Sequence, residues 1–189
     1  MAAEDRVILS LCNGTGSWEA PYREAGYRVI GVDPLNPSEF GHDVRTMRVD
    51  QLPPIHGVLA APPCTHLASS GARWWEAKGP ERLEDALATV FACIDIIAKV
   101  RPMWWALENP VGRLPRYLGK WIETFQPCDY GDPYTKRTCL WGDFTMPRRR
   151  PVEPTEGSKL WRLGPSEDRW RLRSQTPPAF AQAFFEANR

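Results

Sequence analysis

Residues 6–17, RVILSLCNGTGS, are the stretch from which the fold can be predicted. The first six residues are apolar and partly β-branched, which is typical of a short buried strand, and the NGTGS cluster that follows is a turn. Residues 18–25 then have helical character, and YRVIGV at 27–32 is a second strand. The order of strand, glycine turn, helix and strand predicts the first unit of an α/β fold.

The rest of the chain alternates in the same way. Apolar residues recur at spacings of three and four over 81–100, which predicts a helix. Further short apolar runs predict strands at 57–61, 104–107 and 138–141, and a last helix is expected at 177–187. The pattern predicts a Rossmann-like α/β fold with a mostly parallel sheet, in which ligands lie at the carboxyl ends of the strands.

Length and composition fit one domain over residues 1–189. Hydrophobic content is 42% and charged content 25%, as in ordinary globular proteins. No apolar run approaches the roughly 20 residues of a membrane helix, and acidic residues near the N-terminus argue against a targeting segment. The five cysteines form no CxxC pair, so we expect no metal site, no disulfides and a reducing cytoplasm.

Charge is distributed unevenly along the chain. From Lys136 onward there are 11 basic and 6 acidic residues, and the preceding 135 residues carry 13 basic and 17 acidic ones. Residues 142–173 are rich in proline, arginine and glycine without periodicity, which predicts an irregular basic insert. Arg148, Arg149 and Arg150 within it either bind substrate phosphate or form a solvated face.

The glycine turn and the acids that follow it are candidates for a cofactor site. Asn13-Gly14-Thr15-Gly16 follows a strand, and Asp33 ends the next strand, where it could accept hydrogen bonds from ribose hydroxyls. The pattern has no third glycine, so a cofactor without phosphates, such as adenosylmethionine, fits better than a dinucleotide. Asp43 and Val44 could contact an adenine. The alternatives are a structural turn and a loop carboxylate.

Cys64 is the candidate nucleophile. It follows Pro62-Pro63 at the end of the 57–61 strand, where the prolines fix the backbone. An ionised thiol adds to electron-poor carbon atoms, although an isolated cysteine is more often a buried small hydrophobe. The loop at 65–79 is suited to close over a substrate, and its Trp74 and Trp75 either stack on a base or pack.

Glu108 is the candidate acid. It follows the apolar residues 104–107, and desolvation there would raise its pKa so that it could donate a proton. The alternative is an ion pair or a helix cap.

Taken together, these motifs resemble those of the cytosine-5 DNA methyltransferase family. LSLCNGTGSW at 9–18 resembles the family's cofactor turn, APPCTHLASSG at 61–71 its nucleophile loop, and ALENP at 106–110 its acid motif. DYGDPYTKR at 129–137 resembles the segment before its cytosine-oxygen arginines. The likeness is greatest to short methylase-like proteins of phages and prophages, which implies a bacterial or phage-infected host cell.

The resemblance implies a methyltransferase fold, S-adenosyl-L-methionine as cofactor, S-adenosyl-L-homocysteine as product, and DNA or a cytosine nucleotide as partner. Catalysis would rest on Cys64 and Glu108, with Asn109 as a positioning residue and either Lys136 or Arg137 on the base. The implied cofactor-binding residues are Cys12, Asn13, Gly14, Thr15, Gly16, Asp33, Pro34, Asp43, Val44 and Pro63. The implied substrate-binding residues are Thr65, Ser70, Gly71, Arg73, Arg148, Arg149 and Arg150.

The chain departs from the family at three points. Cys12 stands where the family usually has a phenylalanine, the arginine motif aligns on Lys136 and Thr138, and the large sequence-reading region is missing. The missing region leaves open a free nucleotide or a single strand as the substrate. A further alternative is an inactive methyltransferase-fold module that binds nucleic acid or a partner. We expect no membrane or metal partner; target sequence and oligomeric state stay open.

Overall fold

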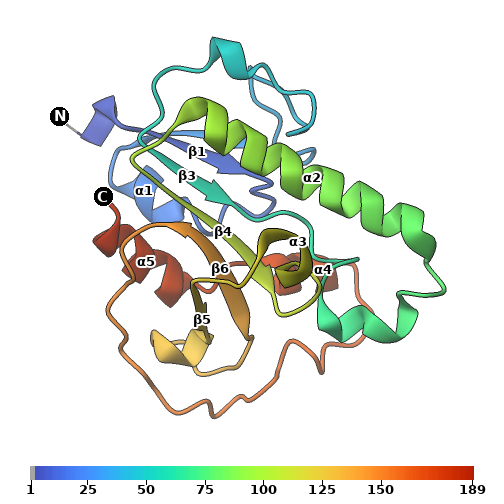
Figure 1. The fold of residues 1–189 in the computed structure, drawn as a ribbon. Helices are drawn as coiled ribbons and strands as arrows, with labels where there is room; N and C mark the ends of the chain where they lie inside the picture. The colour runs from blue at the N-terminus through green and yellow to red at the C-terminus, as the bar shows by residue number, and fades with distance from the viewer. Residues whose placement is uncertain (1–2) are drawn as a thin grey trace.

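The computed structural model describes residues 3–189. Six strands form one sheet in the order β2-β1-β3-β4-β6-β5 (Figure 1). Pairing is parallel from β2 through β1 and β3 to β4, and only β6 runs antiparallel, between β4 and β5. The predicted α/β fold with a mostly parallel sheet is therefore confirmed. The strands are β1 (Val7–Leu11), β2 (Arg28–Val32), β3 (Gly57–Ala60), β4 (Trp104–Pro110), β5 (Glu123–Phe125) and β6 (Thr138–Asp143).

Helices cover both faces of the sheet. The long helix α2 packs on one face, where Val90 and Ile97 meet Leu9 of β1 in a buried cluster. Helices α1 and α5 pack on the other face, where Phe184 meets Ile8 in a second cluster. Alternate residues of β1 enter opposite clusters, as the pleat of a strand requires. The α-helices are α1 (Ala20–Glu24), α2 (Gly79–Val100), α3 (Pro115–Leu118), α4 (Arg169–Ser174) and α5 (Pro178–Ala187). The 3-10 turns are η1 (Ala3–Asp5), η2 (Val49–Gln51), η3 (Ser69–Trp74) and η4 (Pro127–Asp129).

β4 continues beyond the predicted end of its strand. It includes the ENP motif because β6 pairs with it there, with Glu108 opposite Leu140, Asn109 opposite Cys139 and Pro110 opposite Thr138. Both motif side chains are consequently held in a central strand rather than in a loop.

The irregular stretch at 142–173 was only partly predicted. Residues 144–168 contain no helix or strand, but α4 forms within the predicted insert. Asp143 pairs with Trp105 at the amino end of β4, so the chain leaves β6 at the edge opposite the carboxyl ends of the parallel strands. It then returns along the molecule to α4, which lies at the end toward which β3 and β4 point (Figure 1).

Among residues 3–189, no helix is long and apolar enough to cross a membrane, and no group of three potential metal ligands occurs.

Candidate active site

The glycine turn at residues 13–16 leads directly out of β1. Gly14 and Gly16 have φ angles of 39° and 70°, in the left-handed region that glycine adopts without strain. The Gly16 amide donates to the Asn13 carbonyl oxygen at 2.7 Å, and the Gly14 amide donates to Asp33 Oδ2 at 3.0 Å. The turn is therefore closed on itself and tied to the end of β2.

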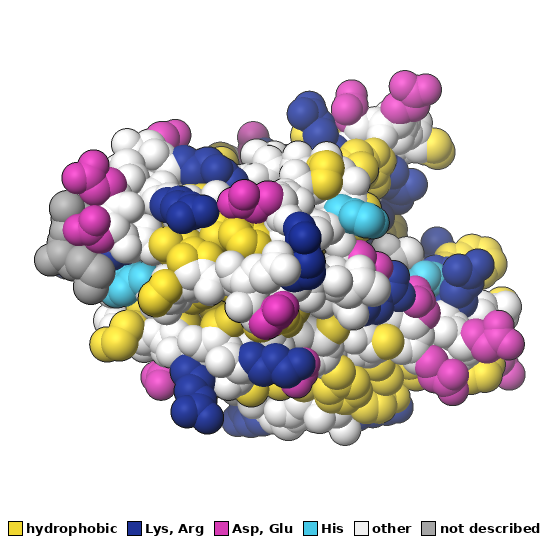
Figure 2. Space-filling view, turned by 90° about the horizontal axis from the view of Figure 1, so that it is seen from above, with side chains coloured by type: hydrophobic (Ala, Val, Ile, Leu, Met, Phe, Trp, Pro, Cys, Tyr) yellow, Lys and Arg dark blue, Asp and Glu magenta, His cyan; other side chains and the backbone are white. Residues whose placement is uncertain are grey.

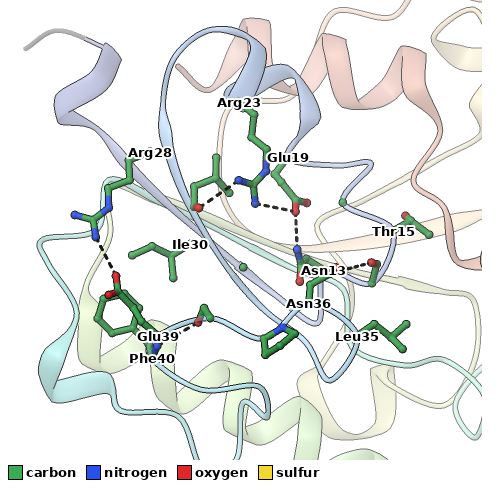
Figure 3. Close-up of a pocket in the computed structure, with 16 residues that line it drawn as sticks. Asn13, Thr15, Glu19, Arg23, Arg28, Ile30, Leu35, Asn36, Glu39 and Phe40 are labelled. Atoms are coloured by element: carbon green, nitrogen blue, oxygen red, sulfur yellow. Dashed lines mark hydrogen bonds and ion pairs between the residues drawn. The ribbon is translucent and has the colours of Figure 1, made fainter.

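Glu19, directly before α1, is a buried carboxylate that sequence reasoning did not identify. The residue is 1% exposed, and it accepts hydrogen bonds from Asn13 Nδ2 at 2.7 Å and Ser10 Oγ at 3.1 Å. Arg23 Nη2 lies 3.7 Å from its Oε1, and Figure 3 shows Asn13 and Arg23 pointing toward it. Glu19 thus links the end of β1 to the first residue of the glycine turn.

The two candidate cofactor acids already have partners within the chain. Asp33 accepts from the amides of Gly14 and Leu35 at 3.0 and 2.9 Å. Asp43 is paired with the Arg45 guanidinium at 2.6 Å, and these hydrogen bonds lower the pKa of Asp43. Asp33 stands beside the glycine turn as expected. Pro34 is exposed, and Val44 is buried in the core cluster on the α2 side.

Cys12 points onto α2. Its Sγ lies 4.0 Å from Cys93 Sγ, and its φ of 55° is unusual for a residue with a side chain. The Cys93 thiol, together with burial, raises the pKa of Cys12. The Cys12 thiol is therefore a packed group and an unsuitable nucleophile.

A small cavity of about 50 Å³ lies under the glycine turn. Ser174 and Thr176 close it from the C-terminal region, and the Thr176 amide donates to Ser17 Oγ at 2.8 Å. Among the buried side-chain atoms of residues 3–189, Trp18 Nε1 and Asn13 Oδ1 have no hydrogen-bond partner, and both residues line this cavity.

A larger groove of about 730 Å³ runs along the outer edge of β2. Figure 3 shows its lining, with Arg23 and Arg28 on one side and Leu35, Asn36 and Phe40 on the other. Neither Cys64 nor Glu108 lines it, so the groove and the catalytic candidates occupy different places.

The nucleophile loop is fixed to β4 by Asn109. This residue is 0% exposed, and its Nδ2 donates to the Pro62 carbonyl oxygen at 2.8 Å. Since Ala60 pairs with Leu107 in the sheet, Cys64, four residues after Ala60, and Glu108, next to Leu107 in β4, lie toward the same end of neighbouring strands. This hydrogen bond links Asn109, the predicted positioning residue, to the nucleophile loop.

A second attachment joins the same two segments further out. The Ser69 amide donates to the Val111 carbonyl at 2.8 Å, and the Arg113 amide donates to the Leu67 carbonyl at 2.9 Å. Between these bonds a Cβ on Gly112 would lie 1.9 Å from the Leu67 oxygen. Only glycine permits this approach.

Glu108 is buried beside a lysine. The residue is 6% exposed, and Lys136 Nζ lies 3.9 Å from its Oε1. Burial raises the pKa of Glu108, and the charge of Lys136 acts against this increase. Gln126 Oε1 accepts from the Lys136 amide and Thr138 Oγ1 donates to the Lys136 carbonyl, so this lysine is held at both ends of its backbone unit.

Arg137 points elsewhere. It is exposed, so of the two candidate cations only Lys136 reaches Glu108.

Cys64 is partly buried in the same region. Burial, followed by the Glu108 carboxyl group, raises the pKa of the Cys64 thiol, whereas the charges of Lys136 and Arg173 lower it. Arg173 belongs to α4 and was not among the site residues predicted from the sequence. The thiol and the carboxyl group therefore resist carrying negative charge at the same time.

The loop after Cys64 carries the exposed candidates for substrate contact. Thr65, Ser70 and Arg73 are exposed, and Gly71 is partly exposed. The two tryptophans differ. The Arg113 guanidinium covers the Trp75 ring at 3.7 Å, so Trp75 packs, whereas Trp74 is 53% exposed.

Arginines 148–150 do not join this group. Their segment runs along η4, where the Arg150 amide donates to the Asp129 carbonyl and the Val152 amide donates to the Cys128 carbonyl, each at 2.8 Å. Arg149 lies 3.5 Å from Glu123 and 3.9 Å from Asp129, and Arg150 lies 3.9 Å from Glu186 of α5. Arg149 and Arg150 are thus paired with acids of the chain itself, and substrate binding by arginines 148–150 stays a prediction.

The fold and these side chains define an α/β protein with a thiol, a carboxyl group and a lysine at the carboxyl edge of its sheet. No protein-family model matches the chain. Among solved structures, it is similar to a DNA modification methyltransferase encoded within a prophage of E. coli, with 16% identity and a TM-score of 0.47 over 78% of this chain and 53% of that one. It is also similar to the Entamoeba histolytica methyltransferase EhMeth, with 12% identity and a TM-score of 0.48 over 85% and 60% of the two chains. The chain thus spans between half and two thirds of the length of these proteins, and identities this low assign it no function.

Proposed function

We propose that this protein transfers a methyl group from S-adenosyl-L-methionine to carbon-5 of cytosine in DNA, through a covalent adduct with Cys64. The observation that carries the proposal is the hydrogen bond from Asn109 Nδ2 to the Pro62 carbonyl, which holds the nucleophile loop against the strand that bears Glu108. Lys136 approaches the same carboxyl group from the chain before β6. A thiol, a proton-holding carboxyl group and a cation are the groups that nucleophilic addition to a cytosine ring requires.

The residues of the glycine turn fit the proposed cofactor. Trp18 Nε1 is a buried donor and Asn13 Oδ1 a buried acceptor, each without a partner, and they match the carboxylate and ammonium groups of a methionine end. Asp33 uses one hydrogen bond on each oxygen, and a carboxylate has about four acceptor positions, so ribose hydroxyls can still donate to it. When bound, adenosylmethionine would supply an electrophilic methyl group.

Cys64 and Glu108 would act as a pair. The Cys64 thiolate bonds to carbon-6 of cytosine, and Glu108 gives its proton to ring nitrogen 3, so that carbon-5 becomes an electron-rich enamine carbon. After carbon-5 has been methylated, its proton leaves to water, and the electron pair of the carbon–hydrogen bond forms the double bond to carbon-6 and expels the Cys64 thiolate. Ring nitrogen 3 then returns its proton to the Glu108 carboxylate. Because burial raises the pKa of Glu108, the acid holds its proton until the ring nitrogen takes it.

Lys136 would hold the exocyclic oxygen of the base. Its ammonium group is within reach of Glu108 and also donates to the Gln175 carbonyl at 3.1 Å. A cation at this place stabilises the negative charge that the ring gains on addition of the thiolate. Arg137, which is exposed, has no part in this step.

A second substrate class is a single strand or a free cytosine nucleotide. It is favoured by the path of residues 144–168, which run from the opposite edge of the sheet and form no helix or strand. Reading base edges in the groove of a duplex usually needs a helix or a strand that enters the groove.

The test is to incubate the protein with methyl-labelled adenosylmethionine and, separately, duplex DNA, single-stranded DNA, RNA and dCMP. We expect label on carbon-5 of cytosine, and none with Cys64→Ser. Label on an exocyclic amino group, or full activity of Cys64→Ser, would overturn the proposal. No transfer with any substrate, despite cofactor binding, would favour the binding-module alternative.

A further inference from the structure

α4 carries two arginines on the face that it turns toward the protein. Arg169 and Arg173 lie four positions apart and both are partly buried, whereas Trp170, Arg171 and Leu172 between them are exposed. Residues four apart lie above one another on a helix, so the two guanidinium groups belong to one inward face.

These two arginines have no acidic partner. Among residues 3–189, no carboxylate lies within 4.0 Å of either guanidinium group, whereas Arg171 on the outer face is paired with Asp168 at 3.5 Å. Arg169 Nε is buried and meets no hydrogen-bond acceptor. Buried charged groups are normally paired, so the buried edge of the Arg169 guanidinium is suited to an anionic partner.

α4 is held at the catalytic edge by the residues that follow it. The Gln175 carbonyl accepts from Lys136 Nζ, the lysine that approaches Glu108. Ser174 and Thr176 line the small cavity together with Ala61, three residues before Cys64. Arg173 is near enough to Cys64 for its charge to lower the pKa of the thiol. Seen from above, lysine and arginine side chains stand among acidic side chains and are not confined to one end of the molecule (Figure 2).

We propose that Arg169 and Arg173 form a phosphate site, which binds the phosphate ester of the nucleotide whose cytosine lies at Cys64. Arginine binds phosphate oxygens through paired N–H donors. The identity of this ligand rests on the proposed function, but the anion site itself does not.

The number of arginines suits a substrate phosphate beside a thiolate. A phosphodiester carries one negative charge, so two guanidinium groups leave one positive charge beside Cys64. The phosphate can therefore bind without cancelling the charge that favours the thiolate. The phosphate of dCMP carries close to two charges at neutral pH and would cancel both.

Alkylation of Cys64 tests the site without methyl transfer. The protein is treated with iodoacetate, an anion, or iodoacetamide, which is neutral, and the Cys64 peptide is quantified by mass spectrometry. Both reagents need the thiolate, so the ratio of their rates reports the anion site and not the thiol pKa. We expect iodoacetate to be favoured by about tenfold over its ratio at a free thiol, the lower end of the enrichment that charged clefts give.

Variants assign the effect to α4. Arg173→Met and Arg169→Met should each lower the ratio, Arg173→Lys should keep most of it, and Arg171→Met is the matched control on the outer face. Inorganic phosphate should slow iodoacetate selectively. If the rates with both reagents fall together in Arg173→Met and the ratio stays constant, Arg173 acts only on the thiol and the phosphate site is refuted.

Ligand protection then distinguishes the two phosphate sources. A trinucleotide with a central cytosine and dCMP are compared with deoxycytidine, which has no phosphate. Stronger protection of Cys64 by either phosphorylated ligand than by deoxycytidine, lost in Arg173→Met, supports the phosphate role, and the stronger of the two identifies the source. Equal protection by all three ligands would overturn it. A protein that shows the anion effect but methylates nothing would contradict the proposed function alone.

Discussion

Replacing Glu19 by alanine should loosen the glycine turn. The carboxylate accepts from Ser10 Oγ and Asn13 Nδ2, and its removal leaves two donors without an acceptor in a site where Glu19 is 1% exposed. Each buried group left unpaired costs about 1–3 kcal/mol. Because Asn13 is partly exposed, we expect the free energy of unfolding to fall by about 2–5 kcal/mol, together with weaker binding of adenosylmethionine. Urea unfolding and calorimetric titration measure the two effects.

Glu19→Gln separates hydrogen bonding from charge. The amide oxygen can still accept from Asn13, and the Ser10 hydroxyl can rotate to accept from the new NH₂ group, so only the charge opposite the exposed Arg23 is lost. Because Arg23 is half exposed, solvent screens its charge and the pair at 3.7 Å contributes at most about 1 kcal/mol. Glu19→Gln should therefore lose no more than that. Glu24→Ala, at the exposed end of the same helix, is the control. A glutamine variant as unstable as the alanine variant would refute this account of the turn.

Three further outcomes are expected. Cys64→Ser should abolish methyl transfer and Cys128→Ser should not; an active Cys64→Ser protein would disprove the adduct. Glu108→Gln should lose about 100-fold or more in rate, as for removal of a general acid. Since the pKa of Glu108 is raised in the folded state, its charge destabilises the protein as the pH rises through that pKa, so Glu108→Gln should unfold at higher urea concentration than wild type at neutral pH and at the same concentration in acid. Replacing arginines 148–150 by serine should leave the rate and the salt dependence of DNA binding unchanged, because Arg149 and Arg150 are already paired with acids of the chain itself; a flatter salt slope would show that these arginines bind DNA.

Much of the fold could be predicted because local patterns coincide with tertiary structure. The helix at 79–100 has apolar residues at helical spacing, and the strand at 57–60 is an uninterrupted apolar run. β5 could not be predicted, because its three residues are too few for a period and it exists through pairing with β6. The extension of β4 through Pro110 likewise depends on β6 and not on its own residues.

The candidate site residues that follow predicted strands could be identified from the sequence. The side chains that contact or surround them could be identified less well. Cys64 and Glu108 stand out because each follows a buried strand. Glu19 does not, because nothing in a sequence marks one glutamate of a short helix as buried. Whether Lys136 or Arg137 lies beside Glu108 depends on where β6 begins. The position of arginines 148–150 depends on the path of the chain after β6. A run of arginines in the sequence predicts a positively charged segment. Where that segment lies in the folded protein depends on contacts with residues far away in the sequence.

The burial of Cys64 and Glu108 accounts for the arrangement of cations around them. Burial raises the pKa of both groups, and the Glu108 carboxyl group raises the pKa of the Cys64 thiol further. Lys136 Nζ lies 3.9 Å from the Glu108 carboxyl group. The charges of both Lys136 and Arg173 lower the pKa of the Cys64 thiol. With Glu108 protonated, the single charge resides on sulfur, and this is the state that can attack a base while the acid still has a proton to give. Arg173 of α4, a short helix after 25 residues without helix or strand, lowers the pKa of the Cys64 thiol. In the proposed mechanism this charge would tie the C-terminal segment to catalysis as well as to substrate binding.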